Sequence, residues 1–193
     1  MHTLVFCGSP HEHGDTSALI CAFLEALGGT HEVVRAYGAG ISPCTDCRAC
    51  WKTPGCAIPD AMQGVYEKIR AADCVVIASP VYYSALTGPL LSLLSRLQCV
   101  YANGRFLNHA LLAGQRLGVV LLAGGGNGRP DPALETARHL LRALHARPVG
   151  CAMSLHTDDL PARQDAAALE AARALARRVR QQSAQQDAQE DQM

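Results

Sequence analysis

The chain has 193 residues, of which 49% are hydrophobic and 18% charged, and its 17 lysines plus arginines balance 17 aspartates plus glutamates. This length and composition predict one globular domain that can bury a core without disulfide or metal cross-links. The formal net charge is zero, no basic stripe is present, and only three Phe and one Trp could stack on bases. Nucleic-acid binding is therefore not expected.

Apolar runs alternate with helical patterns along the chain. In chain order, the predicted elements are a strand at 3–7, a helix at 16–27, a strand at 31–37, a helix at 60–72, a strand at 74–79, a helix at 88–98, a strand at 116–125, a helix at 132–146, a strand at 148–154 and a helix at 163–181. Asp60 is expected to be the N-cap of the second helix. The run 74–79 is continuously apolar, which indicates a strand covered by helices on both faces.

This order of elements predicts an α/β fold with a doubly wound, five-stranded parallel sheet in the flavodoxin-like strand order 2-1-3-4-5. We expect a single domain over residues 1–181 with a cysteine-rich insert at 43–59, and a polar, disordered tail at 182–193. The amino terminus is typical of a first strand and not of a secretion signal. No apolar run approaches the roughly 20 residues that cross a bilayer, so we expect a cytoplasmic protein without membrane contact.

Ligands of open parallel sheets bind beyond the carboxyl ends of the strands, near the switch in strand order. Three unusual loops emerge there, at residues 8–17, 79–88 and 124–131. The first offers the hydroxyls of Ser9, Thr16 and Ser17 beside the free N–H groups of a helix N-terminus, which suits a phosphate. The alternative is an ordinary strand-to-helix loop in which Asp15 is the N-cap.

The other two loops suit a flat ring. Tyr82 and Tyr83 follow a Ser-Pro turn and could lie against such a ring, or could belong to the rim of the core. The run Gly124–Gly126 would let backbone approach a planar ligand closely, or would only make a turn. Three such loops at one edge of one sheet favour a ligand site.

Four stretches carry a family resemblance: GSPHEHGDTSAL, PCTDCRACWKTPGCAIPDAM, AADCVVIASPVYYSALTGPLLSLLSRL and GGGNG. With them the chain resembles the NAD(P)H-dependent FMN reductase superfamily of flavodoxin-like proteins, and within it the iron–sulfur flavoprotein branch. The resemblance implies noncovalent FMN and the reduction of quinones, azo or nitro compounds, or electron transfer onward.

Carried over residue by residue, the resemblance implies cofactor-binding roles for Ser9, His11, Asp15, Thr16, Ser17, Pro80, Val81, Tyr82, Tyr83, Gly124, Gly125 and Gly126. No catalytic side chain is expected, because the flavin itself performs the redox chemistry. Four positions depart from the family pattern. His11 stands where relatives usually carry Arg, and Asp15 where they carry Asn; Leu91 and Ser95 replace a Lys and an Asp, and only Arg96 of that set remains.

Cys44, Cys47, Cys50 and Cys56 follow the spacing C-x2-C-x2-C-x5-C. Such compact runs are typical of 4Fe–4S ligation, and the same spacing occurs in the iron–sulfur flavoproteins. Structural zinc usually prefers two C-x2-C pairs set further apart. Three interpretations stay open: a 4Fe–4S cluster, a zinc site, or thiols that bind no metal.

The expected function is that of an FMN-dependent oxidoreductase. Electrons would pass from NAD(P)H or a reduced carrier such as ferredoxin, through FMN and a 4Fe–4S cluster if one is present, to a quinone-like or other small acceptor. The resemblance also implies a homodimer or homotetramer. The alternatives are an electron carrier or redox sensor of the flavodoxin type without turnover of its own, and a flavin-free protein with a structural zinc.

Overall fold

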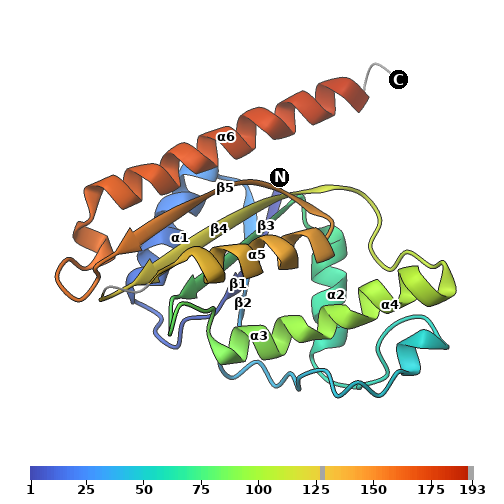
Figure 1. The fold of residues 1–193 in the computed structure, drawn as a ribbon. Coiled ribbons are helices and arrows are strands. Elements are labelled where there is room, and N and C mark those ends of the chain that lie inside the picture. Colours follow the sequence, from blue (N-terminus) through green and yellow to red (C-terminus); the bar gives the residue numbers. More distant parts are fainter. Residues whose placement is uncertain (127–128, 191–193) are drawn as a thin grey trace.

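The computed structural model describes residues 1–126 and 129–190. At its centre is a parallel sheet with the strand order β2-β1-β3-β4-β5, which confirms the predicted order (Figure 1). The strands are β1 (His2–Cys7), β2 (Thr30–Arg35), β3 (Cys74–Pro80), β4 (Arg116–Gly124) and β5 (Ala146–Leu155). All of their carboxyl ends therefore point to one edge of the sheet.

Helices cover both faces of the sheet. The α-helices are α1 (Asp15–Leu27), α2 (Met62–Ala71), α3 (Gly88–Leu94), α4 (Gln98–Leu107), α5 (Asp131–Ala143) and α6 (Ala166–Glu190). Three short 3-10 helices are η1 (Ala49–Trp51), η2 (Ser95–Leu97) and η3 (Ala162–Gln164). In Figure 1, α1 and α6 lie on one face, and α2 to α5 lie on the other.

Successive strand residues point to opposite faces, and so each strand feeds two cores. Val5 and Val76 pack under α1 and α6, whereas their neighbours Phe6 and Ile77 pack against the helices of the other face. All four side chains are fully buried. This two-sided burial explains why the central strands are continuously apolar, as the sequence predicts.

Three helical regions differ from expectation. The predicted helix 132–146 ends earlier, because α5 stops at Ala143 and Ala146 begins β5. The predicted helix 88–98 is divided into α3 and η2, and α4 then continues to Leu107. At the carboxyl end, α6 runs to Glu190 and not to 181, because residues 182–190 contain good helix formers and no Gly or Pro. The predicted disordered tail is thus helical up to Glu190, and 191–193 lie outside the described residues. Across the described part of the chain, no helix is both long and apolar enough to cross a bilayer.

The burial of the sheet centre allows a prediction about the stability of the protein. Replacing Ile77 by Ala in β3 should lower the free energy of unfolding by about 2–5 kcal/mol, because it removes buried methyl groups and leaves a cavity. Val33→Ala, on the half-exposed edge strand β2, is the control and should cost less than about 1 kcal/mol. Urea unfolding measures both losses, provided that the free energy of unfolding depends on urea concentration with the same slope in each variant. Equal losses would contradict this placement of the core.

Candidate functional site

Hydrogen bonds join the loops at the carboxyl edge of the sheet. The Thr87 hydroxyl donates to the carbonyl oxygen of Gly8 at 2.8 Å, which ties the loop after β3 to the loop after β1. Val81 N–H donates to the carbonyl oxygen of Ala123 at 2.7 Å, next to the loop after β4. The three predicted loops are therefore neighbours. Asn127 and Gly128 of the third loop lie outside the described residues.

The loop after β1 is folded by its own hydroxyls. The Ser9 hydroxyl donates to the carbonyl oxygen of His11 and accepts from the His11 N–H, and Ser17 donates to the same carbonyl oxygen, each at 3.2 Å. Gly14 is the N-cap of α1, and no side chain caps the helix. The first-turn N–H groups of α1 therefore stay available for an anion such as a phosphate.

Asp15 does not cap α1, so its predicted N-cap role is wrong. It is the first residue of the helix, and its carboxylate accepts a hydrogen bond from Ala162 N–H at 2.7 Å. This contact ties the loop after β1 to the segment that follows β5. One oxygen of the carboxylate is thereby engaged by the protein itself.

A hollow of about 360 Å³, which we name the edge hollow, lies between the loops after β3, β4 and β5. It is lined by Val81, Tyr83, Ser84, Gly124, Gly125, Gly126, Leu155 and His156. The predicted Val81, Tyr83 and three glycines thus meet at one place, whereas Pro80 and Tyr82 are not in its lining. Tyr83 is fully exposed and has a φ of 51°, in a tight turn closed by backbone hydrogen bonds between Tyr82 and Ala85.

The edge hollow depends on bare backbone at its glycines. A Cβ at Gly124 would lie 3.2 Å from the Cβ of Val81, and one at Gly125 would lie 2.2 Å from an oxygen of Asp158. The loop after β5, with Asp158 and His156, is thus part of the site. No local motif in the sequence marks this loop, and its membership follows only from the position of β5 beside β4.

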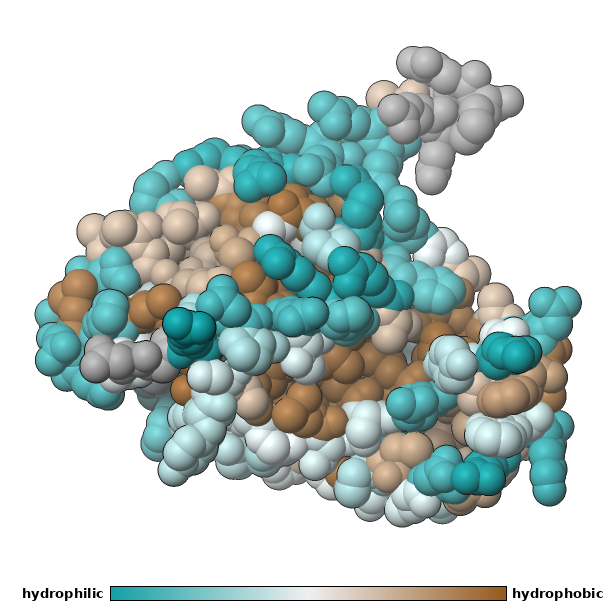
Figure 2. Space-filling view, in the orientation of Figure 1, coloured by the Kyte–Doolittle hydropathy of each residue, from teal (hydrophilic) through white to brown (hydrophobic). Residues whose placement is uncertain are grey.

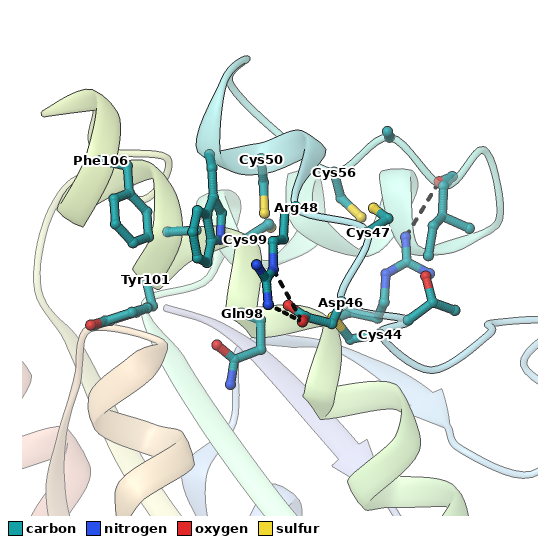
Figure 3. Close-up of a pocket in the computed structure, with 16 residues that line it drawn as sticks. Cys44, Asp46, Cys47, Arg48, Cys50, Cys56, Gln98, Cys99, Tyr101 and Phe106 are labelled. Carbon is teal, nitrogen blue, oxygen red and sulfur yellow. Dashed lines mark hydrogen bonds and ion pairs between the residues drawn. The ribbon is translucent and has the colours of Figure 1, made fainter.

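The four predicted cysteines line a second hollow of about 540 Å³, the cysteine hollow (Figure 3). Cys99 of α4 also lines it. At its outer wall the rings of Trp51 and Phe106 stack with centroids 4.3 Å apart, and the Arg48 guanidinium lies 4.9 Å from the centre of the Trp51 ring.

In Figure 2 apolar surface gathers below α5, over α3 and α4, whereas α5 and α6 present mainly polar side chains.

Side chains from the flanking helices hold three of the cysteines by their backbone. These contacts are Cys44 N–H to Ser95 Oγ at 2.9 Å, Asn103 Nδ2 to the carbonyl oxygen of Cys50 at 3.0 Å, and Gln63 Nε2 to the carbonyl oxygen of Cys56 at 2.9 Å. Asn103 is fully buried and also accepts from Gly55 N–H at 2.9 Å. The loop is therefore fixed through its main chain, which leaves the thiols free to bind.

A buried ion pair closes the base of the loop. Arg96 Nη1 donates to Asp60 Oδ2 at 2.6 Å and to the carbonyl oxygen of Ser42 at 3.0 Å, and Nη2 donates to that of Ile58 at 3.3 Å. The Asp60 carboxylate also accepts from the N–H groups of Ser42 and Met62, each at 3.0 Å. Burial raises the pKa of Asp60, but Arg96 and these two donors outweigh it and lower that pKa below its usual value.

The four thiols of the cysteine hollow lie near one another without converging on a single point. Within residues 1–126 and 129–190, no three Cys, His, Asp or Glu side chains converge as one ion requires. A 4Fe–4S cluster takes four thiolates around a larger body. Burial raises the pKa of Cys50 and its own backbone N–H opposes this, while the nearness of the other three thiols raises it further. Four thiolates this close together would repel one another, so they would be stable here only around a cationic centre.

The parallel sheet has the flavodoxin-like strand order, with its hollow and adjoining loops at the carboxyl edge. A sequence profile described as NADPH-dependent FMN reductase matches residues 1–159, and the chain belongs to this family.

Relatives of known name are similar over most of the chain. An iron–sulfur flavoprotein of Methanocaldococcus jannaschii is 33% identical over 147 residues, which cover 74% of this chain and 72% of the relative. One of Methanosarcina thermophila is 32% identical over 133 residues, which cover 67% of this chain and 66% of the relative.

Two solved structures share the fold. An NAD(P)H:quinone oxidoreductase from Methanothermobacter marburgensis superposes with a TM-score of 0.69 at 19% identity, covering 92% of this chain and 94% of that one. An FMN-dependent NADH-azoreductase from Bacillus anthracis in complex with FMN superposes with a TM-score of 0.64 at 16% identity, covering 92% and 99%.

Because Gly8 is closely packed, we can predict how a larger residue there would affect stability and FMN affinity. A Cβ there would lie 2.7 Å from the Thr87 hydroxyl oxygen and 2.9 Å from a methyl of Leu90, so Gly8→Ala should push the two loops apart. Stability should fall by about 1–3 kcal/mol, and FMN affinity should weaken about tenfold. Urea unfolding and titration calorimetry measure the two effects.

Gly104→Ala is the matched control, because a Cβ at this position of α4 meets open space. It should stabilise the protein by up to about 1 kcal/mol through helix propensity and leave FMN affinity unchanged. If both variants bound FMN like the wild type, the contact between Gly8 and Thr87 would not position the site.

Proposed function

We propose that the protein is an FMN-dependent oxidoreductase whose four-cysteine loop holds a 4Fe–4S cluster. The observation that carries the proposal is the arrangement of Cys44, Cys47, Cys50 and Cys56 around one hollow, with helices holding the main chain of three of them. A loop that only connects β2 to α2 would need no such support. The names of the two iron–sulfur flavoproteins above support the same assignment.

The carboxyl edge of the sheet supplies the FMN site in this proposal. The first-turn N–H groups of α1 would hold the phosphate. The edge hollow would take the ring, with bare backbone at Gly124–Gly126 on one side and Tyr83 on the other. Bound FMN supplies hydride and single-electron chemistry, so the protein binds and orients and adds no acid or base.

Helix α3 joins the two proposed sites. It begins after Thr87, whose hydroxyl binds Gly8 at the sheet edge. It ends at Leu94, directly before Ser95 and Arg96 of η2, which bind the cysteine loop. Its seven residues span about 10 Å at 1.5 Å per residue. This short connection supports the passage of electrons between flavin and cluster.

The proposal includes the electron donor, the acceptor and the assembly. NAD(P)H or a reduced carrier such as ferredoxin would deliver electrons, and a quinone-like compound would accept them. The fold shared with an NAD(P)H:quinone oxidoreductase supports this choice. A homodimer or homotetramer is supported by the apolar surface over α3 and α4, where Tyr101 is 63% and Phe106 is 44% exposed.

Metal and flavin content test the proposal directly. Protein purified without oxygen should contain about four iron and four acid-labile sulfide per FMN. Iron by plasma emission, sulfide by colorimetry and flavin by absorbance measure the three. Flavin without iron, even after anaerobic reconstitution, would contradict the cluster and leave a plain FMN reductase.

Two cysteine variants test which thiols bind. Cys56→Ala should lose most of the iron, because Cys56 is one of the four proposed ligands. Cys99→Ala is the matched control from the same hollow. Its thiol donates to the Tyr66 hydroxyl at 3.1 Å, and burial raises its pKa to about 11, so it should remain a protonated non-ligand. Iron retained by Cys56→Ala, or lost by Cys99→Ala, would contradict the ligand assignment.

A further inference from the structure

Arg96 keeps one hydrogen-bond donor unused. Its side chain is fully buried, and its two Nη groups are occupied by Asp60 and by the carbonyl oxygens of Ser42 and Ile58. Its Nε, by contrast, has no hydrogen-bond partner among the described residues. A buried donor without a partner is costly, and native proteins rarely keep one without a use.

The unused donor belongs to the wall of the cysteine hollow. Arg96 lines this hollow together with Cys56 and Cys50. Burial lowers the pKa of Arg96, but the side chains of Asp60 and Cys56 outweigh it and raise that pKa above its usual value. Arg96 and Cys56 thus face the same hollow, and the unused Nε belongs to its lining residue.

An N–H group directed at cluster sulfur has a defined redox effect. When one electron enters a 4Fe–4S cluster, the negative charge on its sulfurs increases, and a nearby N–H donor stabilises that reduced form. The effect is strong where water is excluded, as around a buried guanidinium. It raises the reduction potential without moving a proton.

We propose that Arg96 is a positioning residue whose Nε–H donates to the sulfur of Cys56, or to the cluster sulfur beside it, and raises the reduction potential of the bound cluster. The inference rests on the proposed function, since it needs the cluster. The Nη groups of the same side chain hold both ends of the loop, so one residue would position the ligands and set their redox response.

The test compares Arg96→Lys with the wild type, both loaded with iron and sulfide under anaerobic conditions. Lys keeps the positive charge but lacks the rigid fork of donors. The reduction potential of the cluster should become more negative, with the equilibrium constant for one-electron reduction about tenfold lower, which is about 59 mV. A redox titration with dithionite as reductant, followed by electron paramagnetic resonance, measures it without turnover.

Arg116→Lys is the matched control. Arg116 is also buried, but its guanidinium binds the carbonyl oxygens of Ile69 and Arg70 near the start of β4 and does not line the cysteine hollow. The same loss of a buried guanidinium at this place should leave the cluster potential unchanged. A potential that falls equally in both variants would make the effect one of general destabilisation and would overturn the inference.

A second variant covers the case in which Lys at position 96 does not fold. The double replacement Arg96→Met and Asp60→Asn removes both charges together with the N–H donor, and it leaves no unpaired buried ion. It should lower the potential at least as far as Arg96→Lys. If the potential is unchanged although iron content falls, Arg96 only supports the loop and the inference is wrong.

The same measurements separate the inference from the proposed function. A wild type that binds no iron overturns the proposed cluster and the inference together. A loaded wild type whose reduction potential equals that of the variants overturns the inference alone.

Discussion

The buried ion pair between Arg96 and Asp60 is the contact on which the cysteine hollow depends. Two charges withdrawn from water are tolerated only when their remaining donors and acceptors are satisfied. Here that demand is met by both ends of the loop, Ser42 and Ile58, and by the first N–H of α2 at Met62. The start of α2, the path of the loop and the position of η2 therefore follow from one electrostatic requirement.

The two proposed sites are built by different means. The edge hollow results from strand topology, because the loops after the neighbouring strands β3, β4 and β5 emerge together at the carboxyl edge. The cysteine hollow instead relies on single side chains, such as Asn103 and Ser95, that reach the loop from neighbouring helices. The first kind of site tolerates change in its loops, whereas the second depends on particular donors and acceptors.

This difference explains what the sequence could predict. The strand order and the meeting of Val81 with Gly124–Gly126 follow from local apolar runs and a general rule about parallel sheets. The contacts of Asn103 and Ser95 join residues 48 to 53 positions apart, and no local pattern marks them. Helix α4 was not predicted beyond Gln98, because its residues include Asn and Gly and it is stabilised by packing against the cysteine loop.

Trp51 is the only tryptophan of the chain, and it lies at the wall of the cysteine hollow, stacked on Phe106. Indole emission depends on the polarity and on the quenching groups around the ring. Light emitted by tryptophan in this protein therefore comes from one place, about 39% exposed to solvent and lining the same hollow as the four thiols. The fluorescence of Trp51 therefore reports on whether that hollow is filled or empty, without an attached label.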